Sequence, residues 1–136
     1  MPGCQSVGMD VPRQPNCAKN QPFVRRLGFA VQGIRTVFAR ESSFRAQSVL
    51  ALGACAGTLL VAPSPGWAAA IMLSAGLVLS LELVNAAIEY LLDHLHPGYS
   101  PAMGAAKDAA AGAVLVASFA SLGVGAAMLW SIVVAR

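Results

Sequence analysis

The stretch "WAAAIMLSAGLVLSLELVNAAIEYLL", residues 67–92, begins as an apolar run and ends with two glutamates and an asparagine. Up to Leu81 it holds only small serines among apolar side chains. A helix needs about 20 residues to cross the hydrocarbon core of a bilayer, so the segment reaches membrane length only if it continues through Glu82 and Glu89. We therefore predict a spanning helix that contains both acids.

The composition supports a membrane protein. Of the 136 residues, 57% are hydrophobic and only 11% are charged, and the mean hydropathy of +0.65 is well above that of a soluble domain. Residues 46–62 carry no charge and are followed by "PSPG", which stops a helix. Residues 109–135 also lack charge. We predict an all-α integral membrane protein with spans at about 46–62, 67–92 and 109–135.

The basic residues predict the orientation. Seven of the nine Lys and Arg residues precede the first span, and none lies between the first and second spans. Because basic residues favour the cytoplasmic side, we expect a cytoplasmic N-terminus.

The N-terminal segment divides into two parts. Residues 1–22 are rich in Pro, Gly, Asn, Gln and Ser without periodicity, which is typical of a disordered tail. Over residues 23–41, apolar side chains recur at helical spacing and most basic and polar ones fall elsewhere. We predict an amphipathic surface helix on the inner leaflet; a helix packed on a soluble partner is the alternative.

Four polar residues at the end of the second span share one helix face. At 100° per residue, Glu82, Asn85, Glu89 and Asp93 fall within a stripe roughly 80° wide. An ionisable group at membrane depth costs about 2.5–3.5 kcal/mol on insertion scales, so it usually faces a cavity or a partner and serves function. Glu82 is the deepest of the four.

The other acids extend this site. Apart from Asp10, the remaining ones, Glu41 and Asp108, also lie next to predicted membrane boundaries, and Lys107 precedes Asp108. Carboxylates gathered at an inner surface can hold Mg²⁺ together with substrate phosphates, and a lysine can neutralise phosphate. A further carboxylate can accept a proton from a hydroxyl nucleophile. The pattern indicates a metal–phosphate site without a P-loop or dinucleotide-binding motif.

Three segments resemble the prokaryotic diacylglycerol kinase family. They are "GFAVQGIRTVFARESSFRAQ" (28–47), "ELVNAAIEYLLDHLHPGYSP" (82–101) and "AKDAAAGAVL" (106–115). The resemblance implies three spans plus a surface helix in the bacterial inner membrane, assembled as a homotrimer with active sites between subunits. It also implies transfer of the ATP γ-phosphate to a lipid alcohol with Mg²⁺.

The resemblance assigns roles to individual residues. Glu82 matches the general base, and Glu41 and Glu89 match the pair that binds Mg²⁺ with ATP. The other matches are Asn85 as a supporting residue, Asp93, Tyr99, Lys107 and Asp108 as ATP contacts, and Phe44 and Arg45, with Glu82, as lipid contacts.

The lipid substrate has two alternatives within this family. "KDAAAGAV", residues 107–114, is nearer to the undecaprenol kinase branch, whereas "ESSFRAQ", residues 41–47, resembles the diacylglycerol branch. We expect diacylglycerol, converted to phosphatidic acid, with undecaprenol as the alternative. Ala105 replaces an arginine often found before A-K-D, which shifts phosphate neutralisation towards Lys107.

Functions of other classes remain as alternatives. Glu82 and Asn85 could hydrogen-bond between spans, a contact worth about 0.6 kcal/mol on average. The chain could also be an ion-conducting subunit or a non-catalytic assembly partner. A conduction path would distribute polar groups across the membrane, whereas here the acids gather at one predicted surface.

Overall fold

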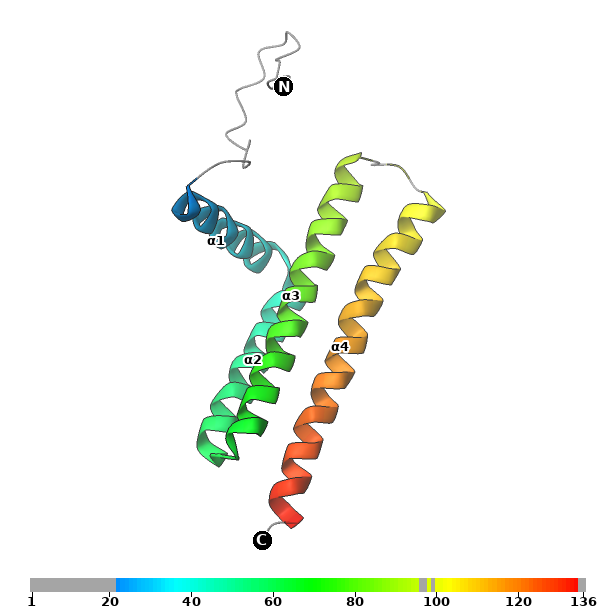
Figure 1. Cartoon of the computed structure of the whole chain (residues 1–136). Helices are drawn as coiled ribbons and strands as arrows, with labels where there is room; N and C mark the ends of the chain where they lie inside the picture. Colours follow the sequence, from blue (N-terminus) through cyan, green and yellow to red (C-terminus); the bar gives the residue numbers. More distant parts are fainter. Residues whose placement is uncertain (1–21, 96–97, 99, 135–136) are drawn as a thin grey trace. The chain divides into compact units, whose positions relative to one another are not determined.

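The computed structural model describes residues 22–95, 98 and 100–134, and all the regular secondary structure in them is helical. Its elements are α1 (Phe23–Arg40), α2 (Ser42–Val61), α3 (Pro65–Leu95) and α4 (Pro101–Val134) (Figure 1). The predicted all-α class is therefore confirmed. Among the described residues, those up to Gly33 belong to one compact unit and those from Ile34 onward to another. The site described below lies wholly in the second unit, and the placement of α1 on the inner leaflet stays a prediction.

Three helices in the described part of the chain, α2, α3 and α4, are long and apolar enough to cross a membrane. Each begins earlier than the apolar pattern alone indicates, at Ser42, Pro65 and Pro101. The reason is that backbone hydrogen bonding does not stop where the hydrocarbon core stops. The 31 residues of α3 rise about 46 Å at 1.5 Å per residue, which exceeds a hydrocarbon core of about 30 Å.

The connection between α2 and α3 is a sharp stop followed by a new start. Ala62 has φ 47° and ψ 54°, in the left-handed region, and its N–H donates to Thr58 O at 3.0 Å. Left-handed residues commonly end helices in this way. Pro65 then opens α3, where its fixed φ suits the first turn of a helix. The predicted stop at "PSPG" is confirmed.

Helix α3 is the middle element and packs against both α2 and α4 (Figure 1). Its buried residues recur every three or four positions and form one stripe: Ile71, Ala75, Val78, Glu82 and Ala86. Glu82 is therefore the one charged member of an otherwise apolar packing stripe.

A small core fixes the junction between α1 and α2 to α3. Val37, Phe44 and Ala86 are buried together, with Leu83 and Tyr90 among the partly buried residues around them. The Phe44 ring also meets Phe38 edge-on, with 6.3 Å between ring centroids. Because these residues flank Glu41 on both sides, the packing determines where Glu41 lies.

The left-handed Ala62 generates a stability prediction. A Cβ in this conformation costs roughly 1–2 kcal/mol, and a β-branched side chain is tolerated least. We expect Ala62→Val to destabilise the protein by about 1–2 kcal/mol and Ala62→Gly not to destabilise it, measured by denaturant unfolding in micelles. Equal losses in both variants would show that the turn does not depend on backbone conformation at this residue.

Candidate active site

The Glu82 carboxylate is the buried centre of the site. The residue is only 5% exposed, and Ser43 Oγ of α2 donates to its Oε2 at 3.3 Å. The carboxylates of Glu89 and Glu41 are close enough to interact with it electrostatically. The structure thus brings together three of the predicted acids, from α3 and from the α1–α2 junction. Like charges at close range repel one another, and a bound cation would relieve that repulsion.

Asn85 and Glu89 lie on the same face of α3, as the helical spacing predicts. Asn85 Nδ2 donates to Glu89 Oε1 at 3.3 Å. The other end of the amide, Asn85 Oδ1, is buried and has no hydrogen-bond partner among the described residues. Asn85 therefore orients Glu89 through its Nδ2 group.

Glu41 is the single non-helical residue between α1 and α2. It occupies the N-cap position of α2 but makes no side-chain capping bond. Its Oε1 instead accepts a hydrogen bond of 2.7 Å from the Tyr90 hydroxyl of α3. Tyr90 was not among the residues that the sequence indicated, because only the fold brings it to Glu41.

Asp93 and Lys107 form an ion pair between the last turns of α3 and the first turns of α4. Asp93 lies one helical turn beyond Glu89, on the predicted stripe, and is 66% exposed, while Lys107 is 33% exposed. Both line a cavity of about 220 Å³ at this end of the bundle, together with Ser100. The predicted ATP contacts Asp93 and Lys107 are therefore neighbours.

The positions of two other predicted ATP contacts do not test their role. Asp108 is an exposed residue of α4, and Tyr99 lies outside the described residues. Their assignment to ATP stays a prediction.

The two predicted lipid contacts on α2 make structural contacts here. Phe44 is buried in the core, and Arg45 Nη1 donates to the carbonyl oxygens of Phe38 and Ala39, each at 3.1 Å. Arg45 thus satisfies carbonyl groups at the C-terminal end of α1, as basic side chains often do. A lipid role for either residue stays a prediction.

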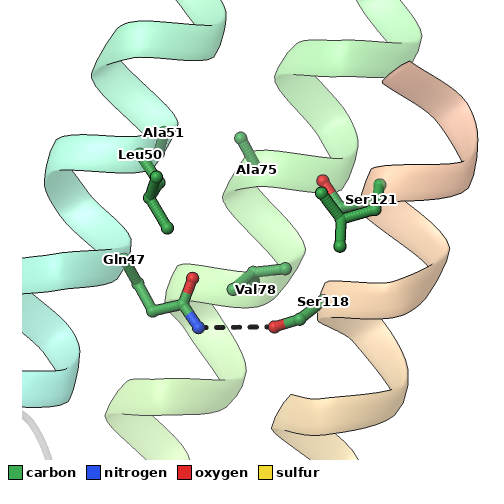
Figure 2. Close-up of a pocket in the computed structure, with 8 residues that line it drawn as sticks. Gln47, Leu50, Ala51, Ala75, Val78, Ser118 and Ser121 are labelled. Carbon is green, nitrogen blue, oxygen red and sulfur yellow. Dashed lines mark hydrogen bonds between the residues drawn. The ribbon is translucent and has the colours of Figure 1, made fainter. Parts of the chain in front are cut away.

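A cavity of about 290 Å³ opens between α2, α3 and α4 (Figure 2). Its lining includes Val78 and Ala75, which lie one and two turns from Glu82 on the same stripe of α3. Gln47 Nε2 of α2 donates to Ser118 Oγ of α4 at 3.4 Å (Figure 2), and Ser121 Oγ donates to Ser74 Oγ at 3.2 Å. This polar group could not be predicted from the sequence, because isolated Gln and Ser residues within apolar spans carry little signal.

The residues fit a metal ion that is held together with phosphate rather than in a cage made by the protein alone. Within the described part of the chain, no group of three or more His, Cys, Asp or Glu side chains is arranged to hold a metal ion. Glu41 and Glu89 nevertheless offer carboxylate oxygens, each already oriented by a hydrogen bond at Oε1. Mg²⁺ is often bound by one or two carboxylates plus substrate phosphates.

Comparison with known proteins identifies the family. The family model described as prokaryotic diacylglycerol kinase matches residues 28–129. The diacylglycerol kinase of Escherichia coli K12 is 28% identical over 109 residues, covering 80% of this chain and 89% of that protein. That of Synechocystis sp. is 32% identical over 102 residues, covering 74% of this chain and 58% of that protein. With three helices able to cross a membrane, the chain belongs to the prokaryotic diacylglycerol kinase family of multi-pass membrane proteins and is a lipid kinase of this type.

Proposed function

We propose that this protein transfers the γ-phosphate of ATP to the hydroxyl of diacylglycerol and forms phosphatidic acid, with Mg²⁺ as the cofactor. The observation that carries the proposal is the buried Glu82 carboxylate, which lies between the other two acids, Glu41 and Glu89, and a cavity of about 290 Å³ along the same face of α3. The names of the bacterial relatives, which are diacylglycerol kinases, support the choice of lipid.

Glu82 is the proposed general base. A base must lie within hydrogen-bond reach of the proton that it accepts. A lipid whose chains occupy the cavity would present its hydroxyl to Glu82 from the side of Val78. Ser43 holds Oε2 of Glu82, so Oε1 is the oxygen expected to accept the proton. Burial keeps water from competing with the lipid hydroxyl as the nucleophile.

Glu41 and Glu89 are the proposed Mg²⁺ ligands, in company with the phosphates of ATP. When bound, Mg²⁺ would neutralise the charge of the phosphates and hold them in place. Lys107, at present paired with Asp93, is the proposed phosphate contact from α4. Phosphoryl transfer depends mainly on positioning and on charge neutralisation, and these side chains provide both.

The polar lining of the cavity favours diacylglycerol over undecaprenol. Two residues that line the cavity, Gln47 of α2 and Val78 of α3, each lie one helical turn from the site, Gln47 from Ser43 and Val78 from Glu82. The cavity therefore begins about 5–6 Å from Glu82 along the helix axis. The ester carbonyls of diacylglycerol, which only accept hydrogen bonds, would lie near this depth. Gln47 carries a second amide hydrogen besides the one given to Ser118. Undecaprenol is hydrocarbon at that depth and offers no acceptor.

The proposal includes a homotrimer in the bacterial inner membrane with the N-terminus in the cytoplasm. The basic residues before α2 support this orientation, which would place Glu41, Glu89 and Lys107 on the side where ATP is present. Large apolar side chains exposed on α2 and α4, among them Leu50, Leu59 and Phe119, are available for contact with lipid and with other subunits.

The substrate assignment predicts the outcome of a direct assay. Purified protein in mixed micelles should transfer labelled phosphate from ATP to diacylglycerol in preference to undecaprenol. Gln47→Leu should raise the KM for diacylglycerol several-fold and leave the KM for ATP unchanged, because it removes a donor to the esters while keeping the volume. Preference for undecaprenol, or a Gln47→Leu variant with an unaltered KM for diacylglycerol, would contradict the assignment.

The base assignment predicts a loss confined to the chemical step. Glu82→Gln keeps the shape of the side chain and should lower kcat by about 10²–10⁴-fold, with little change in the KM for ATP. Ser80→Ala is the matched control on the same helix, since Ser80 is exposed and its hydroxyl donates to Gly76 O one turn earlier. If Glu82→Gln disrupted the oligomer and left specific activity intact, Glu82 would be a hydrogen-bonding residue between spans instead.

The metal assignment predicts a different phenotype for the other two glutamates. Glu41→Gln and Glu89→Gln each remove one negative ligand, so each should raise the Mg²⁺ concentration needed for half-maximal activity by about tenfold or more. The KM for diacylglycerol should change little. Titration of Mg²⁺ at fixed ATP checks this, and an unchanged Mg²⁺ requirement in both variants would exclude the pair as metal ligands.

A further inference from the structure

Of the hydrogen bonds to the three clustered carboxylates, Glu41, Glu82 and Glu89, the one from Tyr90 is the shortest. Its hydroxyl donates to Glu41 Oε1 at 2.7 Å, across 49 residues of sequence, whereas the bonds to Glu82 and Glu89 are both 3.3 Å. A hydroxyl bonded to an ionised carboxylate at this distance is a charge-assisted bond, roughly twice as strong as a neutral one. Glu41 is therefore the most firmly oriented acid of the cluster.

The Tyr90 ring is itself held on two sides. It packs against the core of Val37, Phe44 and Ala86, and the guanidinium of Arg40 lies 5.9 Å from the ring centroid. A cation at this distance is attracted to the face of an aromatic ring. With the ring fixed, the hydroxyl has little freedom to move away from Glu41.

The two proposed metal ligands are oriented in the same way. Each is bonded at Oε1 by a neutral donor from α3, Glu41 by Tyr90 and Glu89 by Asn85. Glu41 occupies the N-cap position of α2, but its side chain accepts no capping hydrogen bond from the backbone of that helix. Hydrogen bonds of this kind aim metal ligands, and their loss typically lowers metal affinity or activity 10–100-fold.

We propose that Tyr90 is a positioning residue for the metal–nucleotide site, whose hydroxyl aims the Glu41 carboxylate towards the ion shared with Glu89. This inference rests on the proposed function, in which Glu41 and Glu89 bind Mg²⁺ with ATP. Tyr90 does not touch the reacting atoms. Because it acts through Glu41, its loss should impair the binding of the metal ion and ATP and leave lipid binding unchanged.

The test variant is Tyr90→Phe, which removes the hydroxyl and keeps the ring, its packing and the Arg40 contact. Mn²⁺ prefers oxygen ligands as Mg²⁺ does, and its binding can be followed by electron paramagnetic resonance in micelles with a non-hydrolysable ATP analogue. We expect the Mn²⁺ affinity to fall about tenfold. The Mg²⁺ requirement for activity should rise by a similar factor, with an unchanged KM for diacylglycerol.

Leu79→Ala is the control for a merely structural role. Leu79 packs on the same core but has no polar group, so its truncation should lower the unfolding temperature and leave Mn²⁺ affinity unchanged. If Leu79→Ala weakened Mn²⁺ binding as much as Tyr90→Phe, the positioning role would be overturned. A Tyr90→Phe variant that bound Mn²⁺ like the wild type would overturn it too.

A double variant tests the route of the effect. If Tyr90 acts through Glu41, then adding Tyr90→Phe to Glu41→Gln should cause no further loss of Mn²⁺ affinity, because interacting residues are not additive. A full additional loss would overturn the proposal.

Failure of the proposed function gives a separate result. Wild-type protein that binds Mn²⁺ with nucleotide but phosphorylates no lipid alcohol would refute the lipid kinase assignment, while the comparison with Tyr90→Phe would still decide the role of Tyr90. Wild-type protein that binds no Mn²⁺ in the presence of nucleotide would overturn both.

Discussion

The burial of the Glu82 carboxylate in the seam between α2 and α3 is the constraint on which the rest of the site depends. An ionised carboxylate removed from water is unfavourable unless it is paired or hydrogen-bonded. Ser43 supplies one hydrogen bond, but Glu41 and Glu89, which interact with it electrostatically, carry charge of the same sign. Such an arrangement weakens the fold. In the proposed function this cost has a use, because the acids would bind a cation together with the phosphates of ATP.

The fold compensates by fixing the acids from outside the cluster. Two residues that follow Glu41 hold its position. Phe44 packs the start of α2 against α3 in the core, and Arg45 donates hydrogen bonds to carbonyl groups at the end of α1. The chain can therefore turn at Glu41 without using the Glu41 side chain as a cap. Its carboxylate remains available for Tyr90 and, in the proposed function, for a metal ion.

The sequence could predict those features that depend only on residues close together in the chain. The three apolar helices and the stripe that contains Glu82, Asn85 and Glu89 depend on the length of a run and on a period of 3.6 residues, and both were predicted. The predicted bounds were those of the membrane spans, and the helices extend past them, because hydropathy reports the hydrocarbon core while the hydrogen-bonded helix continues beyond it. This is why α4 begins at Pro101 and not near 109.

Contacts between distant residues could not be predicted in the same way. The bond from Gln47 to Ser118 spans 71 residues, and the ion pair of Asp93 with Lys107 joins two helices. The first depends on how α2 and α4 are arranged around α3, and the second on how α3 packs against α4. For Glu41, the resemblance to a family supplied a role, but it gave no indication of the partner that holds the side chain.

The polar groups along α3 follow an order that fits the two substrates of the proposed function. From Asp93, which is largely exposed, through the half-buried Glu89 to the buried Glu82, the surroundings change from aqueous to apolar within three turns. The cavity lined by Val78 and Ala75 continues the series along α3, away from Asp93. ATP, which is charged, and a lipid alcohol, which is not, could approach from opposite ends of this series. In the proposed function their reacting groups would meet at Glu82, the buried carboxylate of the series, where a base can reach the lipid hydroxyl while ATP stays on the aqueous side.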